Sequence, residues 1–246
     1  MTESGKAIQT YPDAQALARA AAEQFVTLGS AAIAGAGRFS VALSGGSTPQ
    51  AMFNLLATEP FVKRIEWARV HLFWGDERCV PPDHPDSNYR MTREALLDKI
   101  AIPAANVHRM RGEVDPVQAV AEYAEGLRAF FGMANFPHFD LVLLGMGDDG
   151  HTASLFPGTA AIHESNAWVI APYVAKVSMW RMTLTPPVLN AARQIRFLVA
   201  GAGKADRLAD VLNGPYQPDT LPAQIVKPTG GELVWMVDAA AASKIQ

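Results

Sequence analysis

The stretch FDLVLLGMGDDGHTASLFPG, residues Phe139 to Gly158, joins a short apolar run to a loop of glycines, aspartates and a histidine. The apolar run stops at Gly145, a pattern typical of a central β-strand that is buried on both faces. The residues after it cannot build a core, but they bring backbone and titratable groups close to a ligand. Because ligands in open α/β sheets lie beyond the carboxyl ends of the strands, His151 is the leading catalytic candidate.

The same loop contains a Gly-x-Gly-x-x-Gly pattern from Gly145 to Gly150, formally the dinucleotide-binding fingerprint. That fingerprint requires a long helix at its end, whereas Pro157 stops any helix within about two turns. Asp148 and Asp149 would also lie where a pyrophosphate must bind, and like charges repel. Nucleotide binding is therefore disfavoured, and the structural alternative is a glycine-rich turn with a capping aspartate and a surface histidine.

Length and composition indicate an ordinary globular protein. With 246 residues, 49% hydrophobic and 18% charged, the chain can bury a large core, and one domain over residues 1–246 is expected. A net charge of -3 offers no basic field for nucleic acid or membrane. The sequence has neither a signal-peptide pattern nor the ~18 apolar residues of a membrane span, so we expect a cytoplasmic protein. The lone Cys79 excludes an internal disulfide and Cys-paired zinc sites.

Strand and helix patterns alternate along the chain. Strands are expected at 39–43, 70–74, 107–110, 139–144, 168–171, 181–185, 195–200 and 233–237. Helices are expected over 13–34, 49–56, from about 88 toward 97, over 116–131, after 187, up to 212, and near the carboxyl end. This alternation predicts an α/β fold, a doubly wound and mainly parallel sheet with helices on both faces.

The segment SGGSTP, residues 44–49, follows the first of these strands directly. Pro49 is expected at the first helical position, with a hydroxyl residue just before it. A strand, a Gly-Gly turn and a helix N-terminus together form an anion site, because free N–H groups and the helix dipole point at one spot. The alternative is that the glycines only make the turn and that Ser47 or Thr48 only caps the helix.

Two further charged segments follow predicted strands. Asp76, Glu77 and Arg78 are costly to place at the end of a buried strand unless they bind a ligand or, as the alternative, one another. The later segment Gly-x-Gly-Lys, ending at Lys204, resembles a truncated P-loop but has Ala205 where Ser or Thr is required, so nucleoside triphosphate binding is disfavoured. Lys204 can still hold a monophosphate, or can be an exposed, solvated lysine.

Taken together, several motifs strongly resemble the 6-phosphogluconolactonase family, in the family's order and across nearly the whole chain. They are residues 44–49, 74–78 with Ser87-Asn88, 145–158 and 181–185. The resemblance implies hydrolysis of 6-phosphogluconolactone in the oxidative pentose phosphate pathway, without metal or cofactor. It also implies a Rossmann-like fold shared with glucosamine-6-phosphate deaminases. One departure is Val177-Ser178, where the family pattern would have Pro-Pro after Lys176, and it leaves the local loop shape open.

Two rival functions are weighed against this resemblance. The related deaminases carry a glutamate five residues after the histidine for an acid/base relay, and this chain has Phe156 there. A sugar-phosphate sensor of the kind found in related transcriptional regulators is the non-enzymatic alternative. No DNA-binding module precedes residue 13, and the His151 loop would be unnecessary in a sensor. The expected partner is therefore a small sugar-phosphate lactone, with the protein a monomer or weak homo-oligomer.

The chemistry of lactone hydrolysis assigns roles to the candidates. An imidazole can serve as base for the attacking water and then as acid for the departing oxygen, and both roles fall to His151. Arg78 is expected to stabilise the oxyanion, with Asp76 and Asp149 orienting hydroxyls or the imidazole. No Gly-x-Ser-x-Gly elbow exists, and Cys79 lacks a nucleophile signature. His151 and the aspartates near it do not form the cluster of ligands that a metal site requires, so no metal is expected.

The phosphate is expected to be gathered from distant loops that converge at the carboxyl edge of the sheet. Lys204 and Arg181 are carried over from phosphate ligands of the related deaminases. Arg181 fits only if its strand runs antiparallel or its loop folds over the sheet edge. The expected substrate-binding residues are Ser44, Gly45, Gly46, Ser47, Asp76, Asn88, Arg181 and Lys204, and the catalytic residues are His151, Arg78 and Asp149.

Overall fold

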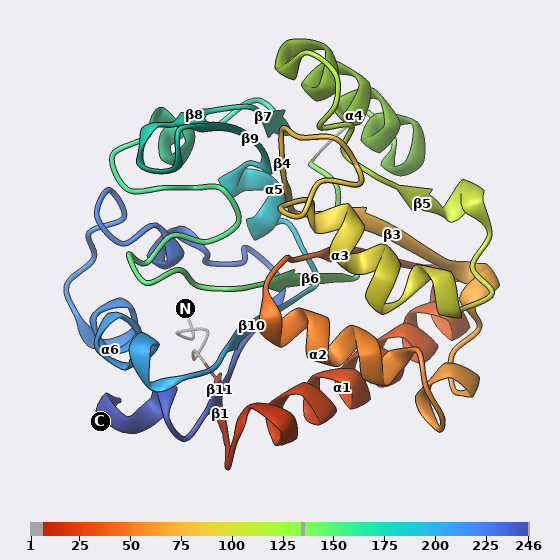
Figure 1. Cartoon of the computed structure of the whole chain (residues 1–246), viewed down its shortest axis with the longest axis horizontal. Coiled ribbons are helices and arrows are strands. Elements are labelled where there is room, and N and C mark those ends of the chain that lie inside the picture. The colour runs from red at the N-terminus through yellow and green to blue at the C-terminus, as the bar shows by residue number, and fades with distance from the viewer. Residues whose placement is uncertain (1–6, 134–135, 246) are drawn as a thin grey trace.

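The computed structural model describes residues 7–133 and 136–245, and a parallel seven-stranded sheet forms its centre (Figure 1). The strand order is β1-β11-β10-β6-β2-β3-β5. The strands are β1 (Ala7–Tyr11), β2 (Phe39–Leu43), β3 (Val70–Trp74), β5 (Val107–His108), β6 (Leu141–Leu144), β10 (Gln194–Val199) and β11 (Glu232–Asp238). Every pairing is parallel, which confirms the predicted α/β class. β1 was not predicted, and it joins the sheet as the edge partner of β11.

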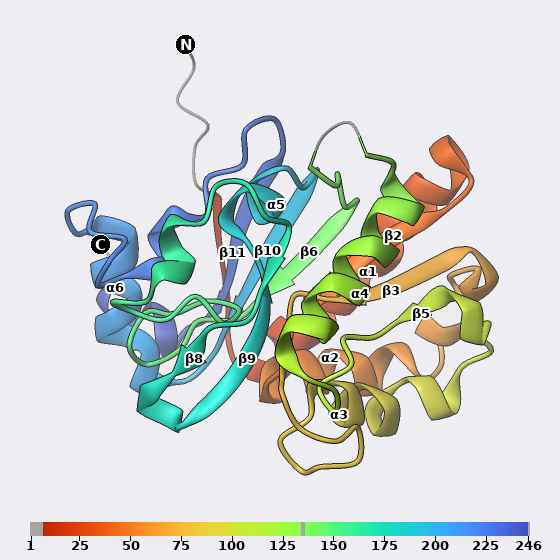
Figure 2. The same cartoon turned by 90° about the horizontal axis from the view of Figure 1, so that it is seen from above.

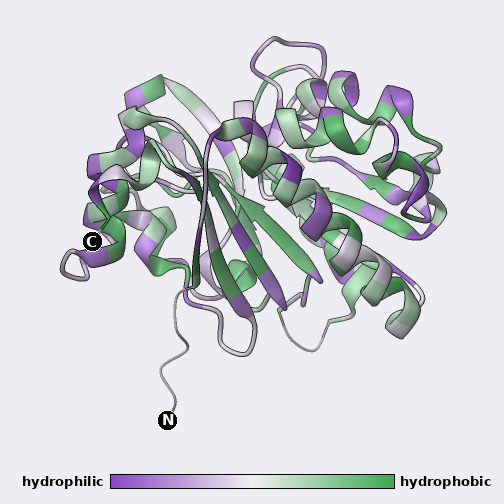
Figure 3. Cartoon of the chain, turned by 90° about the horizontal axis from the view of Figure 1, so that it is seen from below, coloured by the Kyte–Doolittle hydropathy of each residue, from purple (hydrophilic) through white to green (hydrophobic). Residues whose placement is uncertain are grey.

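Helices cover both faces of this sheet. They are α1 (Ala14–Ala36), α2 (Ser47–Leu56), α3 (Asn88–Ala95), α4 (Pro116–Phe131), α5 (Pro186–Asn190) and α6 (Ala205–Asn213). Figures 1 and 2 show α1 and α2 on one side, with α4 and α5 on the other. Figure 3 shows hydropathy that fits this arrangement. The central strands are mostly hydrophobic, whereas the helices carry both hydrophobic and hydrophilic residues. No helix in the described ranges is long and apolar enough to cross a membrane.

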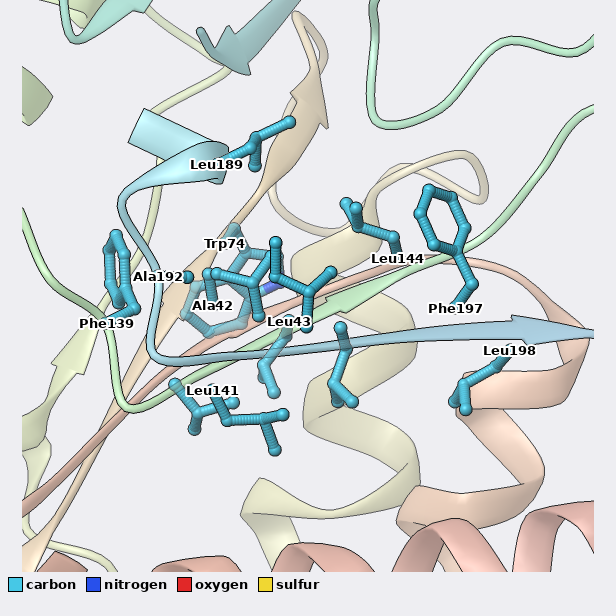
Figure 4. Packing of buried hydrophobic residues seen from close by; sticks show 14 of the residues in the cluster. Ala42, Leu43, Trp74, Phe139, Leu141, Leu144, Leu189, Ala192, Phe197 and Leu198 are labelled. Atoms are coloured by element: carbon cyan, nitrogen blue, oxygen red, sulfur yellow. The ribbon is translucent and has the colours of Figure 1, made fainter. Parts of the chain in front are cut away.

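The central strand β6 begins at Leu141, two residues later than the apolar run predicts, and all four of its residues are buried. It pairs with β2 on one side and β10 on the other. Figure 4 shows Leu144 and Phe197 on one face of the sheet, and Leu141 and Leu198 on the opposite face. Each fully buried side chain of this kind contributes roughly 1.5 to 3 kcal/mol, so a strand buried on both faces needs an almost continuous apolar sequence.

Helix α1 has the limits that its sequence signals require. The Asp13 carboxylate accepts a hydrogen bond from the Ala16 backbone N–H at 2.8 Å, which caps the first turn. Gly37 ends the helix with a φ of 74°, a left-handed conformation that favours glycine. Leu17 and Phe25 are fully buried on the face turned to the sheet. The predicted helix over 13–34 is therefore confirmed, and the helix continues for two residues more.

Helix α2 differs from its prediction at its start. It begins at Ser47, and Gly46 takes the N-cap position with a φ of 105° and no side-chain cap. Pro49 is therefore the third helical residue rather than the first, and neither Ser47 nor Thr48 is the cap. Proline is tolerated there because the first four N–H groups of a helix have no intrahelical partner. The first turn instead presents its free N–H groups beside the Gly45-Gly46 backbone.

A second, antiparallel sheet lies above the main one, and the alternation of strands and helices did not predict it. Its strands are β4 (Asp76–Arg78), β7 (Val169–Ile170), β8 (Tyr173–Val174) and β9 (Met179–Leu184), with β9 pairing to each of the others. The predicted strands at 168–171 and 181–185 belong to this sheet. Strands of two or three residues are too short for a periodic signal, which explains why β4 and β8 were missed.

Candidate active site

A cavity of about 340 Å³ opens where the carboxyl ends of β2, β3, β6 and β10 meet the antiparallel sheet. It is lined by predicted site residues from the antiparallel sheet and from the segments that follow the main-sheet strands, namely Ser44, Gly45, Gly46, Asp76, Arg78, Asn88, His151, Arg181 and Lys204. Ser47 is exposed on the first turn of α2 and does not line the cavity. Asp149 also does not line it, because this residue lies behind His151. The cavity thus brings together residues that are as far apart in sequence as Ser44 and Lys204.

His151 and Asp149 form a hydrogen-bonded pair in the loop that follows β6, which we call the histidine loop (residues 145–158). His151 Nδ1 lies 2.5 Å from Asp149 Oδ1, and the same oxygen accepts the His151 backbone N–H at 3.1 Å. Burial alone would raise the pKa of Asp149, but hydrogen bonds from His151 and Lys176 outweigh it and hold that pKa well below its usual range. An ionised Asp149 therefore fixes Nδ1 as the protonated nitrogen and leaves Nε2 available for proton transfer.

Glycine is required at one position of the histidine loop for a steric reason. A Cβ on Gly147 would lie 2.1 Å from both Nδ1 and Cε1 of the His151 ring. The Gly147 backbone also donates a hydrogen bond to the His151 carbonyl at 2.9 Å. The imidazole therefore packs directly on the backbone of Gly147, and no helix follows the glycines as a dinucleotide site would require.

Phe156 lies against the catalytic candidate on its other side. Its ring stacks on the His151 imidazole with a centroid distance of 4.0 Å and an interplanar angle of 20°. Phe156 is 5% exposed. Phe156 stands where the related deaminases carry a glutamate. Its apolar ring has no carboxylate, so this residue cannot relay protons to His151.

Two arginines lie side by side across the antiparallel sheet. Arg78 on β4 and Arg181 on β9 are register partners, and both line the cavity. Arg78 Nη1 donates to the Asp86 carbonyl, whereas the Nε atoms of both arginines are buried with no partner among the described residues. Burial first, and the charge of Arg78 second, lower the pKa of Arg181. Two adjacent, partly desolvated guanidinium groups attract an anion, and the antiparallel direction of β9 meets the condition stated for Arg181.

Lys204 supplies a third cation, from the turn that precedes α6. Its ammonium forms an ion pair with the Asp148 carboxylate. The loop before it is fixed by buried Asp238, whose carboxylate accepts the Gly201 N–H at 3.0 Å. We call Arg78, Arg181 and Lys204 the cationic wall.

The carboxylates beside Arg78 are held by neutral donors. Asp76 accepts hydrogen bonds from Ser154 Oγ at 2.7 Å and Asn88 Nδ2 at 3.3 Å. Glu77 accepts the backbone N–H groups of Asn88 and Tyr89, both at 2.7 Å. Within residues 7–133 and 136–245 neither carboxylate forms an ion pair with Arg78, so the alternative of a mutual salt bridge is not what the structure has. These bonds dock the start of α3 onto β4.

Asn88 in turn explains why residue 45 is glycine. A Cβ on Gly45 would lie 1.9 Å from Asn88 Oδ1, so the amide occupies the space that any other side chain would need. The Gly-Gly turn and the start of α3 are therefore fitted to each other at the edge of the cavity.

Lys176 is a charged residue of the cavity lining that was not among the predicted site residues. It lies in a 3-10 turn (Ala175–Val177) between β8 and β9, and its ammonium donates to Asp149 Oδ2 at 2.6 Å. Ser178 follows with a φ of 49°, which a proline ring does not permit. The turn therefore differs from the Pro-Pro shape expected at this place. The family pattern includes Lys176, but a single surface lysine carries no local signal of a contact with Asp149.

No group of three or more His, Cys, Asp or Glu side chains within the described ranges is arranged to hold a metal ion. Within the histidine loop, Asp149 bonds to His151 through Oδ1 and to Lys176 through Oδ2.

The chain is similar to known proteins over nearly its full length. Residues 12–235 match the family "Glucosamine-6-phosphate isomerases/6-phosphogluconolactonase". A 6-phosphogluconolactonase of Nostoc sp. is 41% identical over 243 residues, which cover 98% of each chain. A protein of Oryza sativa subsp. indica named probable 6-phosphogluconolactonase 3, chloroplastic, is 37% identical, over 93% of this chain and 73% of the rice protein.

A solved structure extends the similarity to three dimensions. The 6-phosphogluconolactonase of Trypanosoma brucei superposes with a TM-score of 0.87 at 29% identity, over 99% of this chain and 100% of that one. Sequence and fold therefore agree over nearly the full length. The chain belongs to the glucosamine-6-phosphate isomerase/6-phosphogluconolactonase family.

Proposed function

We infer that this protein is a 6-phosphogluconolactonase, a hydrolase that converts 6-phospho-D-glucono-1,5-lactone to 6-phosphogluconate in the oxidative pentose phosphate pathway. Relatives that carry this name match nearly the whole chain. The observation that carries the inference for the site is the His151–Asp149 pair at 2.5 Å, in a cavity whose other walls carry Arg78, Arg181 and Lys204. A proton-transfer group therefore faces a cationic pocket of a size suited to one sugar phosphate.

His151 serves as general base and then as general acid. Its Nε2 removes a proton from a water as the oxygen of that water bonds to the lactone carbonyl carbon, and the carbonyl oxygen becomes an oxyanion. The oxyanion then collapses, the bond from carbon to the ring oxygen breaks, and the imidazolium returns the proton to that oxygen. Asp149 accepts the Nδ1 hydrogen bond throughout and stabilises the imidazolium that forms between the two steps.

The cationic wall divides its work between the two ends of the substrate. Arg78 stabilises the oxyanion, and its partnerless Nε supports a role toward a ligand. Arg181 and Lys204 hold the phosphate together with the backbone of Gly46 at the start of α2. Asp76 and Asn88 face the sugar hydroxyls, with Ser44 and Gly45 completing that side of the cavity.

No step of this mechanism uses a metal or a cofactor. The direct test is hydrolysis of 6-phosphogluconolactone by the purified protein, followed in a coupled assay with and without EDTA. Activity that survives exhaustive chelation is expected, whereas loss on chelation with recovery on added zinc would mean that a metal, and not the imidazole alone, activates the water.

A deaminase is the second candidate function, because the fold is shared with that branch of the family. Phe156 argues against it, since its ring occupies the side of His151 where the deaminase relay needs a carboxylate. Ammonia release from glucosamine-6-phosphate, assayed on the same preparation, separates the two activities. A preparation inactive on both substrates would favour the sensor alternative.

The organisation of the protein remains part of the proposal. We propose a single catalytic domain that acts as a monomer or weak homo-oligomer, as the sequence leads us to expect. Light scattering after size exclusion measures that state. A cytoplasmic location is proposed from the sequence, although some relatives bear chloroplastic names.

A further inference from the structure

Asp149 is held by two side chains, one on each of its carboxylate oxygens. Oδ1 lies 2.5 Å from His151 Nδ1, and Oδ2 accepts a hydrogen bond from Lys176 Nζ at 2.6 Å. His151 and Asp149 come from the histidine loop, whereas Lys176 comes from the β8–β9 hairpin of the other sheet. The three groups thus form a chain from the solvent, through the carboxylate, to the imidazole.

The hairpin that carries Lys176 is built to hold its turn. Ser178 adopts a left-handed conformation, and its N–H donates to the Ala175 carbonyl at 3.1 Å. Tyr173 and Trp180 pack edge to face across the two strands, at 5.5 Å between ring centroids. Lys176 therefore leaves a defined turn rather than an irregular loop, and its ammonium reaches the carboxylate from a fixed position.

The energetic case for a role at the site comes from the difference in exposure between the two partners. The Lys176 side chain is 62% exposed and that of Asp149 is 19% exposed. An exposed lysine ion pair adds little to folding stability, so stability alone gives little reason for this contact. A largely buried carboxylate, however, is costly without a cation, and a neutral imidazole provides none. Lys176 compensates that charge while His151 is neutral and ready to act as base.

We propose that Lys176 is a positioning residue, which acts through Asp149 to hold the His151 imidazole in the tautomer and orientation needed for proton transfer. This inference rests on the proposed function, because it concerns the same imidazole. It differs from a direct role of Lys176 in phosphate binding, which its place on the cavity wall also permits. The two roles predict different kinetics.

The first test compares Lys176→Met, Lys176→Arg, Asp149→Asn and the double variant Lys176→Met/Asp149→Asn. Lys176→Met should lower kcat by roughly tenfold or more with little change in KM, since misplacing a catalytic group by about 1 Å costs on the order of a hundredfold. Lys176→Arg should retain most of the activity. In the Asp149→Asn background, Lys176→Met should have almost no further effect, because the group through which it acts is already neutral.

Lys244→Met is the matched control. Lys244 also pairs with an aspartate, Asp206, and its side chain is 56% exposed, but neither residue lines the cavity. Its removal should leave kcat and KM unchanged. A Lys176→Met variant that behaves like this control would overturn the proposal. Two other results would also overturn it: an effect of Lys176→Met confined to the KM of the phosphorylated lactone, or an effect that persists in full in the Asp149→Asn background. Either result would instead indicate that Lys176 binds the phosphate.

A spectroscopic measurement tests the same idea without turnover. In protein labelled with ¹⁵N-histidine, the His151 signals, assigned by their loss in His151→Asn, should report a neutral ring protonated on Nδ1. Lys176→Met should shift or broaden these signals, because the carboxylate loses the contact on Oδ2 that fixes its orientation, and Lys176→Arg should not. Unchanged His151 signals in Lys176→Met would overturn the positioning role even in active enzyme. Absence of lactonase activity in the wild type would instead defeat the proposed function, and the NMR result would still decide the role of Lys176.

Discussion

The histidine loop and the cationic wall face each other across one cavity but are built in opposite ways. The loop is a single run of sequence, and its chemistry is held by contacts between neighbours, with Asp149 and His151 only two residues apart. The wall is assembled from Arg78 and Arg181, on two paired strands of the antiparallel sheet, and from Lys204, in the turn between β10 and α6. A short sequence motif can therefore carry the reacting groups, whereas recognition of a dianion needs charges that only the folded chain brings together.

The largest expected effect breaks the loop side of this comparison. His151→Asn should reduce kcat by about a hundredfold to ten-thousandfold, because general acid–base catalysis contributes that much, while KM changes little. Steady-state kinetics on 6-phosphogluconolactone measures both constants. Turnover equal to the wild type would remove His151 from the mechanism and require another base.

A second change tests the geometry of the loop without touching a titratable group. Gly147→Ala places a Cβ where the His151 ring now lies, at 2.1 Å, so the imidazole must move. A displacement of about 1 Å should lower kcat on the order of a hundredfold. Gly35→Ala in α1 is the control, since a Cβ there meets nothing within 4 Å. Equal activity of the two variants would mean that the ring tolerates displacement.

A third experiment acts on the wall. Lys204→Ala or Arg181→Gln should weaken kcat/KM for the phosphorylated lactone by roughly 10- to 150-fold, the equivalent of about 1.5 to 3 kcal/mol for a charge-assisted hydrogen bond. The effect should appear in KM. Unphosphorylated gluconolactone has no phosphate to lose, so wild type and variants should hydrolyse it equally poorly. A variant that weakens both substrates alike would place its residue at the carbonyl or in the fold.

The smallest expected effect lies outside both regions, at the β3–β5 edge of the sheet. Burial, followed by the nearby His71, lowers the pKa of His108 from 6.5 to about 4. The unfolded chain then takes up the proton first, so the stability that neutral His108 provides is complete above about pH 6.5 and is lost as pH falls toward 4.

The variant His108→Gln removes this proton uptake. Between pH 7 and pH 5 the wild type should lose stability through His108 and the variant should not, so the difference between their Tm values should narrow by about 2 to 4 °C. This corresponds to about 1 kcal/mol of unfolding free energy, after a discount for the partial exposure of His108. Activity at pH 7 should stay unchanged, which would separate acid loss of stability from the chemistry of the histidine loop. Parallel Tm curves for the two proteins would contradict this assignment.

Local sequence signals determined much of the fold. The apolar run before Gly145 predicted the central strand, and the pattern over 13–34 predicted the long helix that Asp13 caps. These features are readable because periodicity and capping act over only a few residues. The same locality made the histidine loop, together with its aspartate, readable as the candidate reacting segment.

The tertiary structure decided what depends on distant pairing. From the sequence, Arg181 could reach the site only if its strand ran antiparallel or its loop folded over the sheet edge. The antiparallel pairing of β9 with β4 places it beside Arg78. The sequence around Lys176 did not indicate its partner, and Lys176 reaches Asp149 only because the β8–β9 hairpin folds over the carboxyl edge of the main sheet. Charged residues from distant segments form one ligand site only after folding has offset the loss of conformational entropy that brings them to the same edge of the sheet. A short stretch of sequence does not contain that information.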